Sequence, residues 1–460
     1  KARMYQAIVA YNGVSITGGN VYAEAEDTAI WGYNSAVSIT GGTVTAVSSN
    51  SSAISAQTTL TISGEDTVVN ATSNASGYSA IRSTDTLTIS NGAQVTATGT
   101  QSSGVDGYGD IVISGTNTSV TASNGAENGA AIIGQGNIQI TDGADVSASG
   151  AGSGIYTTST ESGDAVSISG STVQVKLDSN QNGIYAANGI TITGSWVDAT
   201  EQHSNISISD SVLFEGATGQ VYGDATVPGD VEVPEGKTLN IPANKTLVVP
   251  EGATLTNNGI ITVAQQGAVT NDGTIVGDIQ NAGTTTNNGI IQGAVTGEGT
   301  TNNGGIIQDG DSIQVSTKDA VQKMINTSVG KTEAVVITLT GDITGDLSIP
   351  IGANVVIDGG NQYKIAGKIT CTTSTNAADV TNLTLKNLTM DGDADGDGTN
   401  DIDWAISSAN QSTETVNALN LTLKNCTVKN YANKGMYLTN AKTLRVNSCT
   451  FENNATVEMN

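Results

Sequence analysis

Cysteine, proline, aromatic residues and basic charge are all scarce in this sequence. Its 460 residues include three cysteines, which is too few and too odd a number for a disulfide framework. Only 17 lysines and arginines stand against 43 acidic residues, so no basic stripe can neutralise phosphates and nucleic acid is excluded as a partner. No run of 18 apolar residues occurs, and no segment is therefore predicted to span a membrane.

Glycine, by contrast, is abundant, with 56 residues against five prolines. Glycine permits tight corners, whereas proline would remove a backbone donor from a β-ladder, so this balance is typical of stacked short strands. Only 13% of the residues are charged, and a surface of Ser, Thr and Asn favours a secreted or surface-displayed protein. The sequence opens without a charged leader and apolar core. We expect it to be a fragment whose export signal and anchor lie outside it.

A degenerate repeat runs from residue 7 to about residue 212, typified by SAVSITGGTVTAVSSNSSAISA at residues 35–56. Each unit holds three short runs of alternating apolar residues, which cannot bury one face alone and must stack on neighbouring units. The run recurs in the same direction, which predicts parallel ladders and a right-handed coil. A β-residue advances about 3.3 Å, so about 23 residues suit one three-sided turn. One isoleucine precedes the glycine turn of each unit: Ile16, Ile39, Ile62, Ile89, Ile113, Ile140, Ile168 and Ile192.

Alternation along each unit separates inward from outward side chains. In each unit, the residue that follows the inward residue points outward, and in three units this outward residue is aromatic: Trp31, Tyr156 and Tyr185. Tyr11 and Tyr33 are predicted to stack as neighbours. Aromatic faces pack against the apolar patches of sugars, so these five residues are the candidate ligand-binding site. The predicted inward column is Ile8, Ile30, Ile54, Ile81, Val105, Ile132, Ile155 and Ile184.

This first segment, residues 1–222, resembles the carbohydrate-binding and adhesin-like surface proteins of gut Firmicutes, whose coils carry motifs such as ITGGTV, here Ile39–Val44. The resemblance implies a bacterial, extracellular protein that binds polysaccharide or the surface glycans of host or bacterial cells.

Residues 223–310 follow a different pattern. Thr-Leu pairs recur every 8 residues from Thr238, and Asn-Asn-Gly or Asn-Asp-Gly sequences then begin at Asn257, Asn271, Asn287 and Asn302. Asn and Gly tolerate left-handed backbone conformations, so these sequences are predicted to be corners. Shorter turns imply a slimmer solenoid, and we expect this segment to be a spacer between two β-helical segments.

Residues 311–460 begin with a helix signal. Ser316 and Thr317 are followed by a predicted helix from Asp319 to Asn326, with Ala320, Val321, Met324 and Ile325 on one face. We expect this short helix, near residues 317–326, to cap the open end of a solenoid and block edge pairing. Three matched coils follow: LTLKNLTMDG, LTLKNCTVKN and LRVNSCTFEN. This part, with IDGGNQYKIAG before the coils, resembles the pectin lyase-like right-handed β-helix superfamily, here truncated.

The matched coils align the last two cysteines. Leu388, Cys426 and Cys449 share one coil position, and Asn387, Asn425 and Ser448 occupy the position before it. The asparagines are predicted to form a corner ladder. Thiols one coil apart lie within disulfide range by their Cα separation. Stacked side chains point in parallel, however, which favours buried free thiols.

Few residues carry a recognisable catalytic pattern. The only histidine, His203, has no apparent partner, and no catalytic triad, Cys-His pair, phosphate loop or zinc spacing occurs. Enzymes of the resembled superfamily place Asp, Arg or Lys on one outer groove, but Asp358 is expected to be a corner carboxylate. We therefore predict no catalysis within these residues.

The acidic sequence DGDADGDGTNDID, Asp391–Asp403, occupies a 15-residue insertion in one coil. In a calcium-binding loop, residues with oxygen donors alternate around a turn that glycine permits, and the aspartates of this sequence have that spacing. The sequence resembles dockerin and thrombospondin-type repeats. Position twelve, normally a bidentate acid, is Trp404 here, which predicts weak affinity. The predicted calcium ligands are Asp393, Asp395, Asp397, the Thr399 carbonyl and Asp401.

The sequence thus predicts an all-β protein: a right-handed parallel β-helix with two β-helical segments, residues 1–222 and 311–460, joined by a slimmer spacer, 223–310. The favoured function is an extracellular or cell-surface structural and binding protein, adhesin-like or glycan-binding and monomeric. The alternative is a non-catalytic portion of a polysaccharide lyase or hydrolase.

Overall fold

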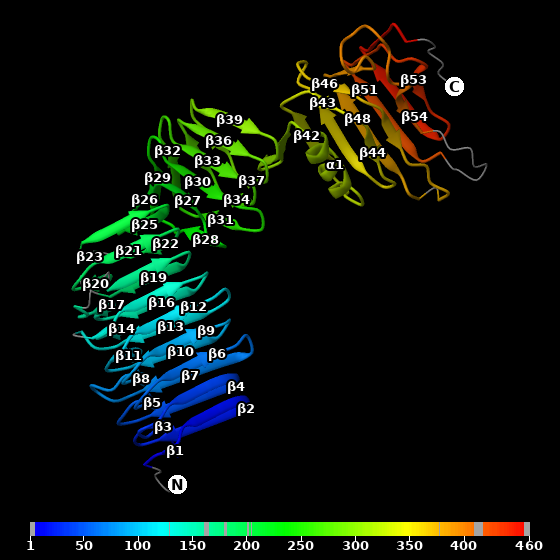
Figure 1. The fold of residues 1–460 in the computed structure, drawn as a ribbon. Helices are drawn as coiled ribbons and strands as arrows, with labels where there is room; N and C mark the ends of the chain where they lie inside the picture. Colours follow the sequence, from blue (N-terminus) through cyan, green and yellow to red (C-terminus); the bar gives the residue numbers. More distant parts are fainter. Residues whose placement is uncertain are drawn as a thin grey trace. The chain divides into compact units, whose positions relative to one another are not determined.

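The computed structural model describes residues 5–127, 129–160, 165–178, 182–199, 202–203, 205–376, 378–408 and 417–454, with backbone only at 202–203. The chain divides into two compact units, one of residues 1–269 and 280–283 and the other of residues 270–279 and 284–460. Short parallel strands stack in both (Figure 1). The predicted fold class, an all-β parallel β-helix with a short helix between segments, is confirmed. The division into three segments stays a prediction. The described residues form no helix that is both long and apolar enough to cross a membrane.

One face of the first unit is a nine-stranded parallel sheet. Its register pairs Ile8 with Ile30, then Ile30 with Ile54, and continues in the same way to Ile184. The predicted inward column is therefore confirmed, and the outward residues Trp31, Tyr156 and Tyr185 follow it in register. The strands are β1 (Ile8–Ala10), β3 (Ile30–Gly32), β5 (Ile54–Ala56), β8 (Ile81–Ser83), β11 (Val105–Gly107), β14 (Ala130–Gly134), β17 (Ser153–Thr157), β20 (Ile184–Ala186) and β23 (Gln202–His203).

The other two faces of this unit belong to one larger sheet, because two long strands bend around the corner between them. These are β2 (Val14–Ala25) and β4 (Val37–Ser48), with Gly19 and Gly42 at positive φ at the bend. Glycine adopts this conformation without strain, which explains the repeated Gly-Gly sequence.

The remaining strands of these two faces alternate along the chain. The second face contains β6 (Leu60–Ser63), β9 (Leu87–Ser90), β12 (Ile111–Ser114), β15 (Ile138–Thr141), β18 (Val166–Ser169), β21 (Ile190–Thr193) and β24 (Ile206–Ser209). The third contains β7 (Thr67–Ser73), β10 (Gln94–Gly99), β13 (Ser119–Asn124), β16 (Asp145–Gly150), β19 (Thr172–Leu177), β22 (Trp196–Asp198) and β25 (Ser211–Glu215).

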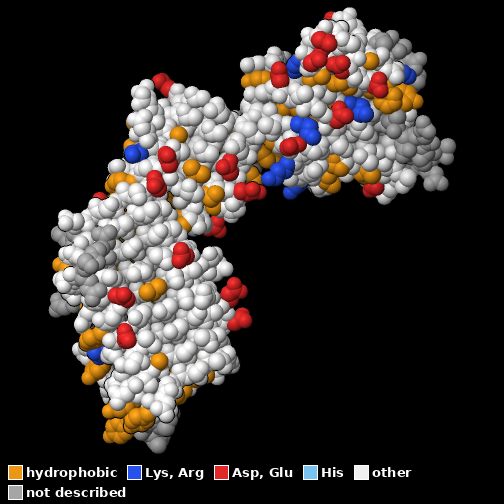
Figure 2. Space-filling view, viewed as in Figure 1, with side chains coloured by type: hydrophobic (Ala, Val, Ile, Leu, Met, Phe, Trp, Pro, Cys, Tyr) orange, Lys and Arg blue, Asp and Glu red, His pale blue; other side chains and the backbone are white. Residues whose placement is uncertain are grey.

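The core of the first solenoid is a narrow stack of Ala, Val, Ile and Leu. Among the residues that the structure describes, no aromatic side chain is fully buried in this cluster. Most of the tyrosines here lie on the outside instead, including Tyr11, Tyr22 and Tyr78, which are exposed. Figure 2 shows hydrophobic side chains gathered over the N-terminal coils and few Lys or Arg side chains on the visible face of the first unit.

The repeat ends at an antiparallel hairpin between β25 and β26 (Thr218–Tyr222). Trp196 and Phe214 pack together there with ring centroids 5.5 Å apart, and Lys237 forms an ion pair with Asp198. This hairpin agrees with the departure from the repeat seen in the sequence. The following strands are β27 (Asp224–Thr226), β28 (Val231–Val233), β29 (Thr238–Ile241), β30 (Thr246–Val249), β31 (Thr254–Asn257), β32 (Ile260–Val263), β33 (Ala268–Asn271) and β35 (Ile279–Asn281).

The second unit begins with short coils in which equivalent residues lie 16 positions apart. Asn271 donates from Nδ2 to Asn287 Oδ1 at 2.7 Å, and Asn287 donates to Asn303 Oδ1 at 2.8 Å. These three amides form an internal ladder, which is buried at Asn271 and Asn287. The strands are β34 (Thr274–Val276), β36 (Thr284–Asn287), β37 (Ile290–Gln292), β38 (Val295–Thr296), β39 (Thr300–Asn303), β40 (Ile306–Asp309) and β41 (Ser312–Val315).

The predicted reason for the Asn-Gly corners of these coils is wrong. None of the asparagines expected there has a positive φ. The side chains of Asn257, Asn271 and Asn287 are buried instead, and glycine is needed because successive coils approach closely. A Cβ on Gly289 would lie 2.0 Å from the carbonyl oxygen of Gly273.

A helix, α1 (Lys318–Thr327), precedes the wider coils of this unit, as predicted. The Thr317 side chain accepts from the Ala320 N–H at its N-cap, and Ala320, Val321 and Ile325 are buried. The Gln322 side chain accepts from Ser348 N at 2.8 Å and donates to Ser348 O at 2.7 Å. The helix therefore satisfies backbone groups at the edge of β44 (Leu347–Ile349), which would otherwise be open for pairing.

Three parallel faces then build the wider coils around a core that runs from Ile306 to Leu438. The first contains β42 (Val335–Leu339), β45 (Asn354–Asp358), β48 (Thr381–Lys386), β51 (Leu419–Lys424) and β54 (Ala441–Asn447). The second contains β43 (Ile343–Thr344), β46 (Lys364–Ala366), β49 (Thr389–Asp391), β52 (Thr427–Lys429) and β55 (Thr450–Glu452). The third contains β44, β47 (Ile369–Cys371), β50 (Trp404–Ser407) and β53 (Lys434–Tyr437).

The corner between the first two of these faces carries the predicted asparagine ladder. Asn387 and Asn425 have φ values of 54° and 52°, and Asn425 donates to Asn387 Oδ1 at 3.1 Å. The cysteines are free, as predicted, with Cys371 and Cys426 buried and Cys449 half-buried. Burial raises the pKa of Cys371 to about 12 and that of Cys426 to about 11.

The close approach at Gly289 gives a stability prediction. Gly289→Ala places a methyl group against backbone that cannot move without shifting the neighbouring coil, so we expect a loss of about 1–3 kcal/mol in the free energy of unfolding. Denaturant unfolding followed by circular dichroism measures it. Gly229→Ala is the control, because open space surrounds a Cβ at that position. Equal effects of the two substitutions would contradict the explanation.

Candidate functional site

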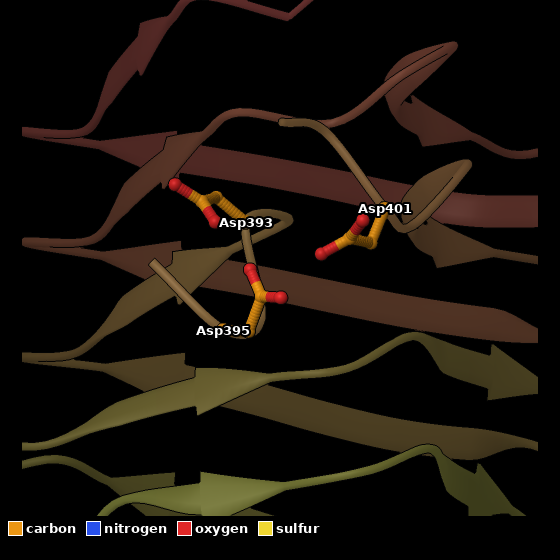
Figure 3. Close-up of side chains that lie close together, drawn as sticks. All are labelled: Asp393, Asp395 and Asp401. Carbon is orange, nitrogen blue, oxygen red and sulfur yellow. The ribbon is translucent and has the colours of Figure 1, made fainter. Parts of the chain in front are cut away.

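The acidic loop, residues 392–403, connects β49 to β50 in the second unit (Figure 3). Its neck is closed by backbone hydrogen bonds to Gly392 O from Asp401 N, at 2.9 Å, and from Ile402 N, at 3.2 Å. Asp391, directly before it, is buried, pairs with Lys429 at 3.4 Å and accepts from Asn430 Nδ2 at 2.8 Å. Both partners come from the following coil, so Asp391 is relieved of the charge repulsion that its sequence neighbours create.

Three of the five predicted calcium ligands lie together. One carboxylate oxygen from each of Asp393, Asp395 and Asp401 lies within 4.8 Å of the others. The two glycines of the loop allow this curl, because Gly396 and Gly398 have positive φ and their N–H groups donate to Asp393. Oxygen ligands at this spacing suit a hard divalent cation.

The other two predicted ligands are not part of this group. The Asp397 carboxylate instead accepts from the Thr399 N–H at 2.7 Å, and hydrogen bonding from Thr399 lowers the pKa of Asp397. Trp404, at the position of the missing twelfth ligand, packs against Tyr437 with ring centroids 5.6 Å apart. Three carboxylates therefore remain as the candidate calcium site, and calcium binding itself stays a prediction.

The predicted aromatic ligand-binding residues form two clusters on the first unit. At the N-terminal coils, the ring centroid of Tyr33 lies 4.8 Å from those of both Tyr11 and Trp31. Farther along the same sheet, Tyr156 and Tyr185 stack with centroids 4.7 Å apart and planes 13° from parallel. The stacking follows from register, because Tyr156 pairs directly with Tyr185 in neighbouring parallel strands.

Sequence reasoning missed a charged group between these clusters. Arg82 lies over the ring of Tyr108 at 4.7 Å, donates to the Tyr108 hydroxyl at 2.6 Å, and its Nε is 3.7 Å from Asp106 Oδ2. Burial raises the pKa of Asp106, and the Arg82 charge opposes that rise only in part. Arg82 and Asp106 directly follow the predicted inward residues Ile81 and Val105, so their pairing could be derived from the register, whereas the position of the Tyr108 ring could not.

Asp358 ends β45, and three neighbouring groups hold its carboxylate. It pairs with Lys386 at 2.9 Å and accepts from Asn387 Nδ2 at 3.0 Å and Gly360 N at 3.0 Å. Burial acts to raise its pKa, but these hydrogen bonds and the Lys386 charge outweigh burial, so the pKa of Asp358 lies below its ordinary value. The side chain of His203 lies outside the described residues.

Comparisons with known proteins cover the chain unevenly. A family model described as a domain of unknown function (DUF4957) matches residues 340–460. No curated protein matches. Among solved structures, a mutant form of the PL6-family alginate lyase AlyGC is similar over 98% of this chain and 78% of that chain, at 12% identity and a TM-score of 0.23.

The prediction that the chain is not an enzyme is corrected by this last comparison. The similar solved structure is a polysaccharide lyase, and the exclusion of catalysis does not stand. At this identity and TM-score, the likeness supplies no catalytic residue and no substrate for this chain.

The loop geometry sharpens the calcium prediction. We expect binding in the weak range of extracellular modules, about 10⁻⁴–10⁻³ M, measured by calorimetry on the intact chain. Asp393→Asn and Asp395→Asn each remove a clustered carboxylate and should abolish the heat of binding, whereas Asp397→Asn should weaken it less. Glu298→Gln is the control for a simple loss of charge. Equal responses from all four variants, or no heat from the unaltered chain, would show that calcium does not bind in this loop.

Proposed function

We propose that this chain is an extracellular or cell-surface β-helical protein that binds polysaccharide or surface glycans, in the manner of an adhesin. The observation that carries the proposal is the placement of the aromatic residues of the first unit. Among the described residues, the core of the repeated coils contains no buried aromatic ring, and the buried Phe214 lies where the repeat ends, while Trp31, Tyr156 and Tyr185 lie in register on one outer sheet face.

The geometry of these rings suits sugars. Tyr156 and Tyr185 are nearly parallel and half-buried, so the strands below hold them rigidly while part of each ring stays open to solvent. A pyranose presents an apolar C–H face to such a ring, and rim hydroxyls remain free for hydrogen bonds. A preformed surface loses little conformational entropy on binding.

Two of the three thiols are compatible with the proposed location outside the cell. A cysteine reacts as its thiolate, and burial raises the pKa of Cys371 to about 12 and that of Cys426 to about 11. These two thiols are therefore inert at neutral pH and would tolerate an oxidising environment. The net charge of −26 favours a soluble monomer.

A second candidate function, part of a polysaccharide lyase or hydrolase, is favoured by charged residues on the outer face of the second unit. Lys386 and Lys424 lie side by side in register on β48 and β51, with Asp358 on the strand before them. Incubation of the chain with a panel of polysaccharides, followed for new reducing ends, tests this candidate. Product formation that is lost in Lys386→Met and Lys424→Met would favour the enzyme.

The binding function gives a prediction for the aromatic pair. Stacking on an aromatic pair contributes about 0.5–1.5 kcal/mol beyond area burial, so Tyr156→Ala with Tyr185→Ala should weaken glycan binding by about two- to tenfold. A glycan array identifies the ligand and calorimetry measures the affinity. Tyr78→Ala removes an exposed tyrosine from outside both clusters and is the control. An array without signal for the intact chain would contradict the proposal.

A further inference from the structure

A polar groove of about 470 Å³ crosses three coils of the second unit; its lining includes Asp391, directly before the acidic loop, but none of the clustered carboxylates Asp393, Asp395 and Asp401. Its floor is one outward column of the face that contains β46, β49 and β52. Lys364 pairs in register with Thr389, and Thr389 pairs with Thr427. Parallel pairing repeats the same position at each coil, so the floor offers one polar side chain per coil along the groove.

Two rows of side chains form its walls. On one side are Asn387 and Asn425, held at the corner in the left-handed conformation and fixed by their mutual hydrogen bond of 3.1 Å. On the other side, Lys429 and Asp391 form an ion pair, and Asn430 fixes the second oxygen of Asp391 at 2.8 Å. Both walls are therefore rigid before any ligand arrives.

The groups that line this groove both donate and accept. Thr389 and Thr427 carry hydroxyls, the asparagines carry amides, and Tyr363 adds a half-buried phenol ring at one end. The formal charges of the lining cancel, with Asp342 and Asp391 against Lys364 and Lys429. A groove for a polyanion or a polycation would show an excess of the opposite charge, whereas mixed donors and acceptors match hydroxyls, which donate once and accept twice.

We propose that this groove binds a neutral oligosaccharide, lying along the coil axis over Lys364, Thr389 and Thr427. Successive sugar residues meet equivalent side chains of successive coils, and the ring of Tyr363 packs against one sugar face. This site is separate from the aromatic face of the first unit and does not rest on the function proposed above.

The test uses the intact chain and neutral hexasaccharides as probes, namely xylohexaose, mannohexaose and cellohexaose, with hexagalacturonate as the charged comparator. Calorimetry measures binding to the chain and to a Thr389→Val, Thr427→Val double variant. Valine keeps the shape of threonine and removes the hydroxyl. Losing two hydrogen bonds of about 1 kcal/mol each should weaken binding of a neutral hexasaccharide by about tenfold or more.

The matched control is Thr384→Val with Thr422→Val. These threonines lie on the same two coils and also point outward, but on the neighbouring face. Unchanged affinity in the control together with weakened affinity in the groove variant supports the proposal. Equal loss in both variants, binding of hexagalacturonate alone, or no binding of any neutral probe overturns it. The Tyr156→Ala, Tyr185→Ala chain should keep this binding, which separates the two sites.

Discussion

Parallel backbone pairing between successive coils is the constraint on which the rest of this structure depends. It places each residue directly above its equivalent one coil earlier, so any chemical property that recurs with the repeat becomes a continuous row. Apolar residues become the core column from Ile30 to Ile184. Amides become ladders, inside the narrow coils at Asn287 and at the outer corner at Asn425. Aromatic rings become the stacked pair Tyr156 and Tyr185.

The strength of this constraint explains how much of the fold could be predicted from the sequence. Period and alternation alone placed Ile30 inward and Trp31 outward, because a parallel ladder leaves no other register once the core face is chosen. The helix α1 was equally predictable, since Thr317 and the buried face of Val321 and Ile325 are local signals. Capping and periodicity need no knowledge of distant residues.

Two features that escaped prediction depend on contacts between coils of unequal length. Lys429 lies 38 residues after Asp391 in the sequence, beyond the insertion that carries the acidic loop, and its charge offsets the repulsion on Asp391. The groove over Thr389 and Thr427 requires the same long-range register. The role of Gly289 was misread for a different reason: composition suggests left-handed corners, but only the stacked backbone shows how closely Gly273 approaches. Site chemistry was thus less predictable than the fold, because it is made by neighbours in space.

The closed neck of the acidic loop has a consequence for how such a chain can change. Backbone bonds at Gly392 return the chain to its path before β50 begins, and Asp391 is fixed to the next coil whatever lies in between. The stretch from Asp393 to Thr399 therefore projects from the solenoid, and its sequence can be rewritten without disturbing the strands on either side, whereas Ile402 packs against the core. Evolution can vary the ligand-binding side chains at such corners while the stacked strands stay intact. An engineer could insert a foreign peptide at Gly396 for display.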